Sequence, residues 1–147
     1  MKEGASDTEY SYGIVPLYKN KNGEIEVLFI QHKEGKWGFP KGHSEKDEEP
    51  LIAAKREFSE ETGITDFELL EGLIFSESYT HHKEGYPRLK VVEYAPAIVY
   101  SKELSPQVDE VNDTKWVDLA HAKDVQLTET RSKLLNSVLE YLSAKQL

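Results

Sequence analysis

The sequence predicts a mixed α/β fold in which helices interrupt a chain that is mostly β. Residues 12–18 and 24–32 carry the apolar-rich patterns of β-strands and are separated by turn-forming residues. A helical pattern follows over residues 47–62, and further strands and helices come after it. With 147 residues, the chain has the size of one typical domain, so we expect a single domain over residues 1–147.

The first two predicted strands form a hairpin. Residues 20–23, Asn-Lys-Asn-Gly, are typical of the turn between two antiparallel strands. The second strand carries apolar side chains on both of its faces, which are Ile25, Val27 and Phe29 on one and Leu28 and Ile30 on the other. We therefore expect a sheet with helices packed on it.

An ordered loop is predicted to lead into the first helix. Residues 37–43, Trp-Gly-Phe-Pro-Lys-Gly-His, are rich in glycine and proline. In the helix predicted over residues 47–62, acidic residues crowd the N-terminal end and Pro50 is tolerated in a first turn. Gly63 is placed to cap the C-terminus, so the helix should run for about four turns.

The rest of the chain predicts more strands and a final helix. The polar segment 78–88 is predicted to be a loop, where binding residues often lie. The expected elements are strands at 67–79, at 88–100 and near 115–117, and helices at 119–123 and 129–144.

Composition excludes several classes of protein. The 18 Lys and Arg against 27 Asp and Glu give a net charge of -9, which opposes binding to long nucleic acid. The chain has no apolar run of about 18 residues and no basic-then-apolar signal at its start, so we expect a cytoplasmic protein with no membrane span. Because cysteine is absent, any metal must be held by oxygen or imidazole.

Three carboxylates share one side of the predicted helix. Glu57, Glu60 and Glu61 are spaced i, i+3 and i+4, while Phe58 falls on a neighbouring face that can pack on the sheet. Like charges at this spacing destabilise a helix, so the group needs a compensating partner unless it is simply a solvated acidic face. Oxygen ligands of this kind suit Mg²⁺ or Mn²⁺, which bind phosphate oxygens at the same time.

These glutamates belong to a longer motif, G-x5-E-x7-R-E-U-x-E-E-x-G-U with U apolar. Every position matches, with Gly42, Glu48, Arg56, Glu57, Phe58, Glu60, Glu61, Gly63 and Ile64. The chain thereby resembles the Nudix hydrolase family. The resemblance implies an α/β/α sandwich with a mixed β-sheet and a metal-dependent pyrophosphohydrolase.

The resemblance also assigns roles to single residues. Glu57, Glu60 and Glu61 become the catalytic metal ligands, together with the Gly42 carbonyl. Glu57 or Glu61 would activate the water that attacks phosphorus. A further carboxylate from a late loop is implied, for which Glu110 is the candidate and Asp109 its rival. The residues with structural roles in the motif are Glu48 and Arg56, as an ion pair that braces the helix, and Gly63.

The segment 37–43 resembles the corresponding loop of the asymmetric diadenosine tetraphosphate hydrolases. That likeness places Lys41 and His43 near the phosphates, with Tyr79 stacking on a base and Lys90 meeting a phosphate. A second aromatic is expected about twelve residues after Trp116, and Leu127 and Thr128 stand there instead. Replacements for it are Tyr86 or Phe75, although a core position is the more natural role for Phe75.

The implied function is cleavage of a small nucleotide, diadenosine tetraphosphate, to ATP and AMP with Mg²⁺. The alternatives are hydrolysis of RNA 5′ triphosphate ends, nucleoside triphosphates or nucleotide sugars by the same motif. A nucleotide-sensing module without catalysis would be expected to lack some of the carboxylates, and none is missing. His81 and His82 are adjacent on the chain and should point apart, so they predict no zinc site.

Overall fold

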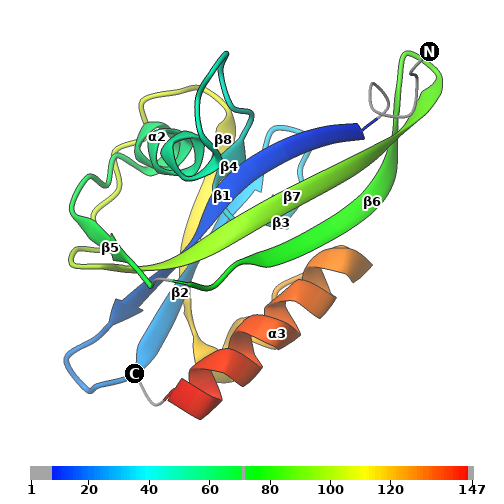
Figure 1. Cartoon of the computed structure of the whole chain (residues 1–147). Helices are drawn as coiled ribbons and strands as arrows, with labels where there is room; N and C mark the ends of the chain where they lie inside the picture. Colours follow the sequence, from blue (N-terminus) through cyan, green and yellow to red (C-terminus); the bar gives the residue numbers. More distant parts are fainter. Residues whose placement is uncertain (1–7, 71, 146–147) are drawn as a thin grey trace.

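The computed structural model describes residues 8–70 and 72–145, which form an eight-stranded sheet with helices on its two faces (Figure 1). The sheet is mixed, because β1 (Thr8–Lys19) runs parallel to β7 (Tyr86–Val99) and antiparallel to β2 (Ile25–His32). This arrangement confirms the predicted α/β class. Within the described residues, no helix is long and apolar enough to cross a bilayer.

The predicted β1–β2 hairpin is confirmed. Its turn is closed by hydrogen bonds from the Asn20 amide to the Glu24 carbonyl, 2.8 Å, and from the Gly23 amide to the Asn20 carbonyl, 2.9 Å. The Asn20 side chain also accepts hydrogen bonds from the backbone amides of Asn22 and Glu24. β1 begins four residues earlier than its apolar pattern indicates, because pairing with β7 continues from Tyr18 back to Thr8.

Two predictions in the middle of the chain are wrong. Residues 67–79 form two strands, β5 (Phe67–Leu69) and β6 (Phe75–Lys83), with Gly72 at a positive φ of 77° between them. The polar segment 78–88 is a β6–β7 hairpin instead of a loop, because Glu84 and Gly85 both adopt the positive φ of a tight turn. The polar residues in this segment are explained by the exposure of the hairpin to solvent, because its backbone is regular.

The segment 37–43 is ordered, as expected, but it contains two short strands. β3 (Trp37–Gly38) pairs with β2, and β4 (Lys41–Gly42) pairs with β1. On the other side of β2 lies β8 (Val111–Asp118), which is longer than the strand expected near 115–117. Pairing of residues 37–42 with the central strands fixes the backbone that leads into the first helix.

Helix α2 (Pro50–Thr62) begins three residues later than predicted. Asp47 has a φ of 63°, which is incompatible with a helix, so the acidic residues 47–49 precede the first turn. Gly63 ends the helix in the left-handed conformation, as predicted, with its amide bonded to the Ser59 carbonyl. The remaining helices, η1 (Leu119–Asp124) and α3 (Glu129–Lys145), agree with their predicted ranges.

The two faces of the sheet have separate cores. Ala54 and Phe58 of α2 pack on Ile14 and Ala95 on one face. On the opposite face, α3 packs over Phe29, Phe39 and Tyr94, and Figure 1 shows the two helices on opposite sides of the sheet. Phe75 is buried in this second core, so its expected core role is confirmed and it is not placed to stack on a substrate.

Candidate active site

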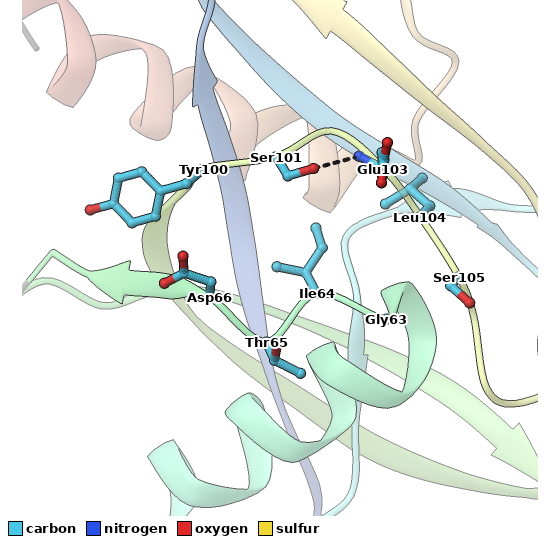
Figure 2. Close-up of a pocket in the computed structure, with 9 residues that line it drawn as sticks. All are labelled: Gly63, Ile64, Thr65, Asp66, Tyr100, Ser101, Glu103, Leu104 and Ser105. Atoms are coloured by element: carbon cyan, nitrogen blue, oxygen red, sulfur yellow. Dashed lines mark hydrogen bonds between the residues drawn. The ribbon is translucent and has the colours of Figure 1, made fainter.

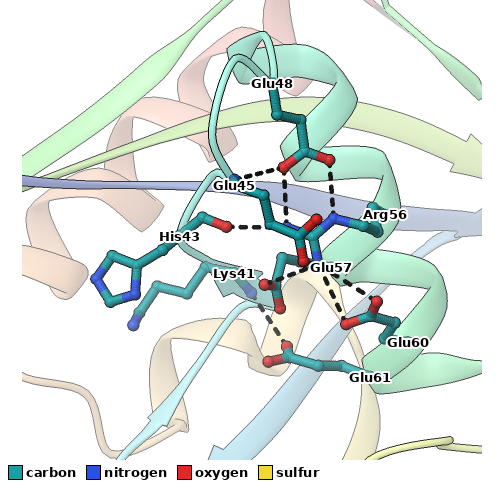
Figure 3. Close-up of polar contacts among 8 residues, drawn as sticks. All are labelled: Lys41, His43, Glu45, Glu48, Arg56, Glu57, Glu60 and Glu61. Carbon is teal, nitrogen blue, oxygen red and sulfur yellow. Dashed lines mark hydrogen bonds and ion pairs between the residues drawn. The ribbon is translucent and has the colours of Figure 1, made fainter.

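Helix α2 presents Glu57, Glu60 and Glu61 beside the β4 strand (Figure 3). The Glu61 side chain accepts the backbone amide of Lys41 at 3.1 Å, and the residue is only 3% exposed. Gly42 lies against the Glu57 carboxylate so closely that a Cβ at this position would overlap it. Glycine is therefore required here to let the carboxylate and the β4 backbone approach one another.

Burial and neighbouring negative charges raise the pKa of two of these carboxyl groups, Glu57 and Glu61. Burial raises the pKa of Glu61 to about 8, helped by the charges of Glu57 and Glu110. Burial also raises the pKa of Glu57. Neighbouring carboxyl groups with raised pKa values are a physical signature of a functional site, because a bound cation would offset the cost of ionising them.

Arg56 links the motif residues to one another. Its Nε and one terminal nitrogen donate to the Glu48 carboxylate at 2.8 and 3.0 Å, which is the predicted ion pair. The other terminal nitrogen lies 3.3 Å from the carboxylates of both Glu57 and Glu60, contacts that the sequence did not suggest. Arg56 also donates to the His43 carbonyl at 3.0 Å, so it ties α2 to the end of the 37–43 segment.

We expect Arg56→Ala to lower the melting temperature by a few degrees, because the bidentate pair and the contact with the His43 carbonyl are both lost. Lys55→Ala on the exposed side of the same helix is the control and should melt like wild type. Differential scanning fluorimetry makes the comparison. An Arg56→Ala protein that melts normally but has lost all turnover would place Arg56 in the chemistry instead.

A late segment is fastened to the last turn of α2. The Ser105 amide donates to the Thr62 carbonyl and the Gln107 amide to the Glu60 carbonyl, both at 2.8 Å. Gly63 lies against the Ser105 backbone, where a Cβ would overlap it, and Figure 2 shows both beside a hollow of about 330 Å³. Gly63 therefore ends the helix and also leaves room for the backbone of this late segment.

The two candidates for the late carboxylate have different surroundings. Glu110 is near enough that its charge contributes to the raised pKa values of Glu57 and Glu61. The Asp109 side chain is fully exposed and lies 3.7 Å from Lys33 Nζ. The geometry therefore favours Glu110 over Asp109.

The four predicted substrate-binding residues lie on or directly after neighbouring strands, and one of them, Lys41, donates its amide to the Glu61 carboxylate. Lys90 Nζ lies 3.1 Å from His43 Nε2, and Tyr79 is paired in register with Lys90 on the neighbouring strand. Burial, followed by the charge of Lys41, lowers the pKa of Lys90 to about 8. Burial also lowers the pKa of Lys41 and of His43, so all three basic side chains hold a positive charge less strongly than in water, and a bound anion would favour that charge.

Tyr79 lines a cavity of about 270 Å³ between β6 and the start of α3. The surrounding side chains are polar, namely Glu34, Lys36, His81, Thr128, Glu129, Thr130 and Arg131. Thr128 stands where the second aromatic was expected, and Tyr86 lies at the far end of the hairpin with 70% of its surface exposed. An aromatic side chain opposite Tyr79 is therefore absent from the lining of this cavity.

A buried ion pair between Arg131, which lines this cavity, and Glu77 was not suggested by the sequence. Arg131 Nε donates to Glu77 Oε2 at 3.1 Å, and the side chains are only 4% and 1% exposed. Arg131 also donates to the Trp37 carbonyl at 3.0 Å, and Thr130 donates to Glu77 at 2.7 Å. The pair joins α3, β6 and β3, and no local sequence pattern connects residues so far apart.

Comparison with known proteins agrees with the fold and the motif. Residues 8–138 match the family model of the NUDIX domain. Since this match covers most of the chain, the protein belongs to the Nudix family and is a Nudix pyrophosphohydrolase.

Three curated relatives show the range of the family that this chain resembles. A protein of Invertebrate iridescent virus 3 is 32% identical over 130 residues, covering 82% of this chain and 70% of that protein. The RNA pyrophosphohydrolase of Bartonella henselae is 29% identical, over 90% of each chain. An mRNA-decapping protein of African swine fever virus is 27% identical over 67% of this chain, which spans only 45% of that viral protein.

Solved structures resemble the chain more completely. A C. elegans Ap4A hydrolase in a binary complex has a TM-score of 0.76 and 27% identity, covering 92% of this chain and 98% of that one. The NUDIX domain of a Shewanella oneidensis protein, solved with ADP ribose, has a TM-score of 0.71 and 20% identity, with coverage of 92% and 88%. The latter likeness shows the fold alone.

Proposed function

We propose that this protein hydrolyses dinucleoside polyphosphates, cleaving diadenosine tetraphosphate to ATP and AMP. The observation that carries the proposal is a set of contacts linking the α2 carboxylates, the Lys41–His43–Lys90 group and the Tyr79 cavity. The Lys41 amide donates to Glu61, Lys90 lies 3.1 Å from His43, and Tyr79, which lines the cavity, is in register with Lys90. The likeness to the C. elegans Ap4A hydrolase, over nearly the full length of both chains, supports this choice.

Divalent cations such as Mg²⁺ are generally used by the family, and the donor set fits one. We propose that Glu57, Glu60, Glu61 and Glu110 hold it together with the Gly42 carbonyl, because oxygen ligands and raised carboxyl pKa values both favour a hard cation. In the described residues, no three acidic or histidine side chains already converge at metal-ligand spacing. Glu57 and Glu60, which contact Arg56 in this structure, would turn towards the ion when it is bound. When bound, the ion would stabilise negative charge on the phosphate oxygens.

The side chains of this chain have separate tasks in the reaction. Lys41, His43 and Lys90 bind the phosphate chain through charge and hydrogen bonds. Glu57 or Glu61 orients a water molecule and accepts its proton as the water oxygen attacks phosphorus. The bond between that phosphorus and the bridging oxygen breaks, and the departing phosphate keeps the electron pair. With diadenosine tetraphosphate the products are ATP and AMP.

Hydrolysis of RNA 5′ triphosphate ends is the second candidate. The observation in its favour is the Bartonella RNA pyrophosphohydrolase, which matches 90% of each chain. The net charge of -9 opposes it, because a long phosphate backbone is repelled outside the basic group. Nucleoside triphosphates and nucleotide sugars are weaker candidates, since their phosphate chains are shorter than that of a dinucleoside tetraphosphate.

A substrate panel tests the proposal. Purified protein with Mg²⁺ is given equal concentrations of diadenosine tetraphosphate, nucleoside triphosphates, nucleotide sugars and a triphosphorylated RNA, and kcat/KM is compared. We expect the highest value for diadenosine tetraphosphate. A highest value for triphosphorylated RNA would transfer the assignment to the second candidate, and inactivity on every substrate would favour a non-catalytic nucleotide-sensing module.

Tyr79→Ala should raise KM for diadenosine tetraphosphate about tenfold, because stacking of a base on an aromatic ring contributes about 1–3 kcal/mol relative to alanine. Tyr79→Phe keeps the ring and should change KM little. Steady-state kinetics with an inorganic polyphosphate as the base-free reference separates stacking from general damage. Equal KM values for wild type and Tyr79→Ala would contradict base binding at this cavity.

A further inference from the structure

Beyond Lys90, basic side chains continue across three strands of the sheet. Glu9 on β1 is in register with Lys90 on β7, and His81 on β6 is in register with Arg88 on β7. Lys83 follows His81 on the same face of β6, two residues along. These five residues, Glu9, His81, Lys83, Arg88 and Lys90, are here named the cross-strand patch.

Glu9 is the acidic member of the cross-strand patch. Its Oε1 lies 3.2 Å from His81 Nε2, and its Oε2 lies 3.6 Å from Lys83 Nζ. Burial opposes its ionisation, yet the charges of Lys83, His81 and Lys90 hold the pKa of Glu9 below its usual value. The basic residues of the patch therefore already bind one carboxylate, which is the Glu9 side chain.

The cross-strand patch is continuous with the residues proposed to bind the phosphate chain. Lys90 contacts His43 at 3.1 Å and also feels the charge of Lys41. The chain as a whole has a net charge of -9, so a cluster of basic side chains here is opposite in sign to the overall charge. Neighbouring cations repel one another, so a ligand anion that joins them lowers the free energy of the arrangement.

We propose that the cross-strand patch is a further phosphate subsite, where the Glu9 carboxylate gives way to a phosphate oxyanion that Lys83 and His81 bind. The inference rests on the proposed function, since it extends the same phosphate path beyond Lys90. Two kinds of substrate supply such a group. One is a phosphate chain longer than that of a dinucleoside tetraphosphate, and the other is the first internucleotide phosphate of a 5′-phosphorylated RNA.

The variants Glu9→Gln and Lys83→Gln test the subsite, with Glu26→Gln and Lys102→Gln as matched controls. Lys102 Nζ lies 2.7 Å from Glu26, and the two side chains are 41% and 15% exposed. The corresponding values for Lys83 and Glu9 are 59% and 18%. Each control changes the net charge by one unit, as its test variant does. The controls lie near the opposite end of β1, where Tyr18 pairs with Glu26.

The first measurement is binding of inorganic tripolyphosphate, without divalent cation and at fixed ionic strength, by isothermal titration calorimetry. Relative to its control, Glu9→Gln should bind about two- to fivefold more tightly and Lys83→Gln about two- to fivefold more weakly. This readout needs no hydrolysis, so it stands apart from the proposed function. If Glu9→Gln binds no tighter than Glu26→Gln, Glu9 is an ordinary surface partner and the subsite is refuted.

Turnover then distinguishes the two sources of the phosphate. Lys83→Gln should lower kcat/KM more for diadenosine hexaphosphate than for the tetraphosphate if the source is a polyphosphate chain. It should lower kcat/KM more for a triphosphorylated dinucleotide than for a nucleoside triphosphate if the source is RNA. If the protein hydrolyses both substrates of each pair and Lys83→Gln shows no preference in either comparison, the subsite is overturned. Tripolyphosphate binding that depends on Lys83, in a protein that leaves dinucleotides intact, would keep the subsite and refute the dinucleotide function.

Discussion

Glu60→Gln and Glu61→Gln should each lower turnover at saturating Mg²⁺ by at least about a hundredfold, because each removes a negative ligand from the proposed cation site. Both variants should fold, since the amide is nearly the same size as the carboxylate. Glu49→Gln is the control, an exposed carboxylate immediately before α2 whose side chain makes no capping hydrogen bond. Turnover above half of the wild-type value in either test variant would mean that the cation is held elsewhere.

Without a bound cation, Glu61→Gln should make the stability of the protein less dependent on pH. Burial raises the pKa of Glu61 to about 8, so between the unfolded value and pH 8 the folded state holds a proton that the unfolded chain releases. Wild-type stability should therefore fall as pH rises through this window, whereas Glu61→Gln should show less of this loss. Melting curves in chelator at pH 5 and pH 8 compare the two slopes, and parallel slopes would contradict the burial of an ionisable group here.

Arg131→Ala should destabilise the fold by about 3–5 kcal/mol, because it leaves the buried Glu77 carboxylate without its charged partner. Glu77 also accepts hydrogen bonds from Tyr94, 3.3 Å, and Thr130, but neither carries a charge. The contact of Arg131 with the Trp37 carbonyl is lost at the same time, which loosens the start of the segment that carries Lys41 and His43.

An exposed ion pair on the same helix provides the control for Arg131. Lys133 Nζ lies 3.7 Å from Glu129, and the two side chains are 75% and 85% exposed. Lys133→Ala should leave urea unfolding nearly unchanged, because solvent screens such a pair. If Arg131→Ala unfolds at the same urea concentration as Lys133→Ala, the buried pair does not stabilise the fold.

Local features of the site were predictable from the sequence because they lie within one helix. The spacing of Glu57, Glu60 and Glu61 places them on one side whatever the helix packs against, and the predicted Glu48–Arg56 pair is formed. Gly63 ends α2 through a left-handed conformation that glycine adopts without strain. The hairpin of β1 and β2 was equally predictable, since its turn residues bond to one another.

Features that depend on distant residues were not predictable in this way. Glu77 and Arg131 are separated by 54 residues and meet only because α3 packs on β6. The β6–β7 hairpin was missed because its exposed polar side chains resemble those of a loop, and the turn at Glu84 and Gly85 is short. The start of α2 was misplaced because acidic residues suit both a first turn and the segment before it.

The most direct test of the central claim is the identity of the products that wild-type protein and Mg²⁺ form from diadenosine tetraphosphate. Separation of the early reaction mixture by ion-exchange chromatography gives the amount of each nucleotide. The proposed site predicts ATP and AMP in equal amounts, with formation abolished by chelator. Two equivalents of ADP, or an intact dinucleotide alongside rapid removal of pyrophosphate from triphosphorylated RNA, would contradict it.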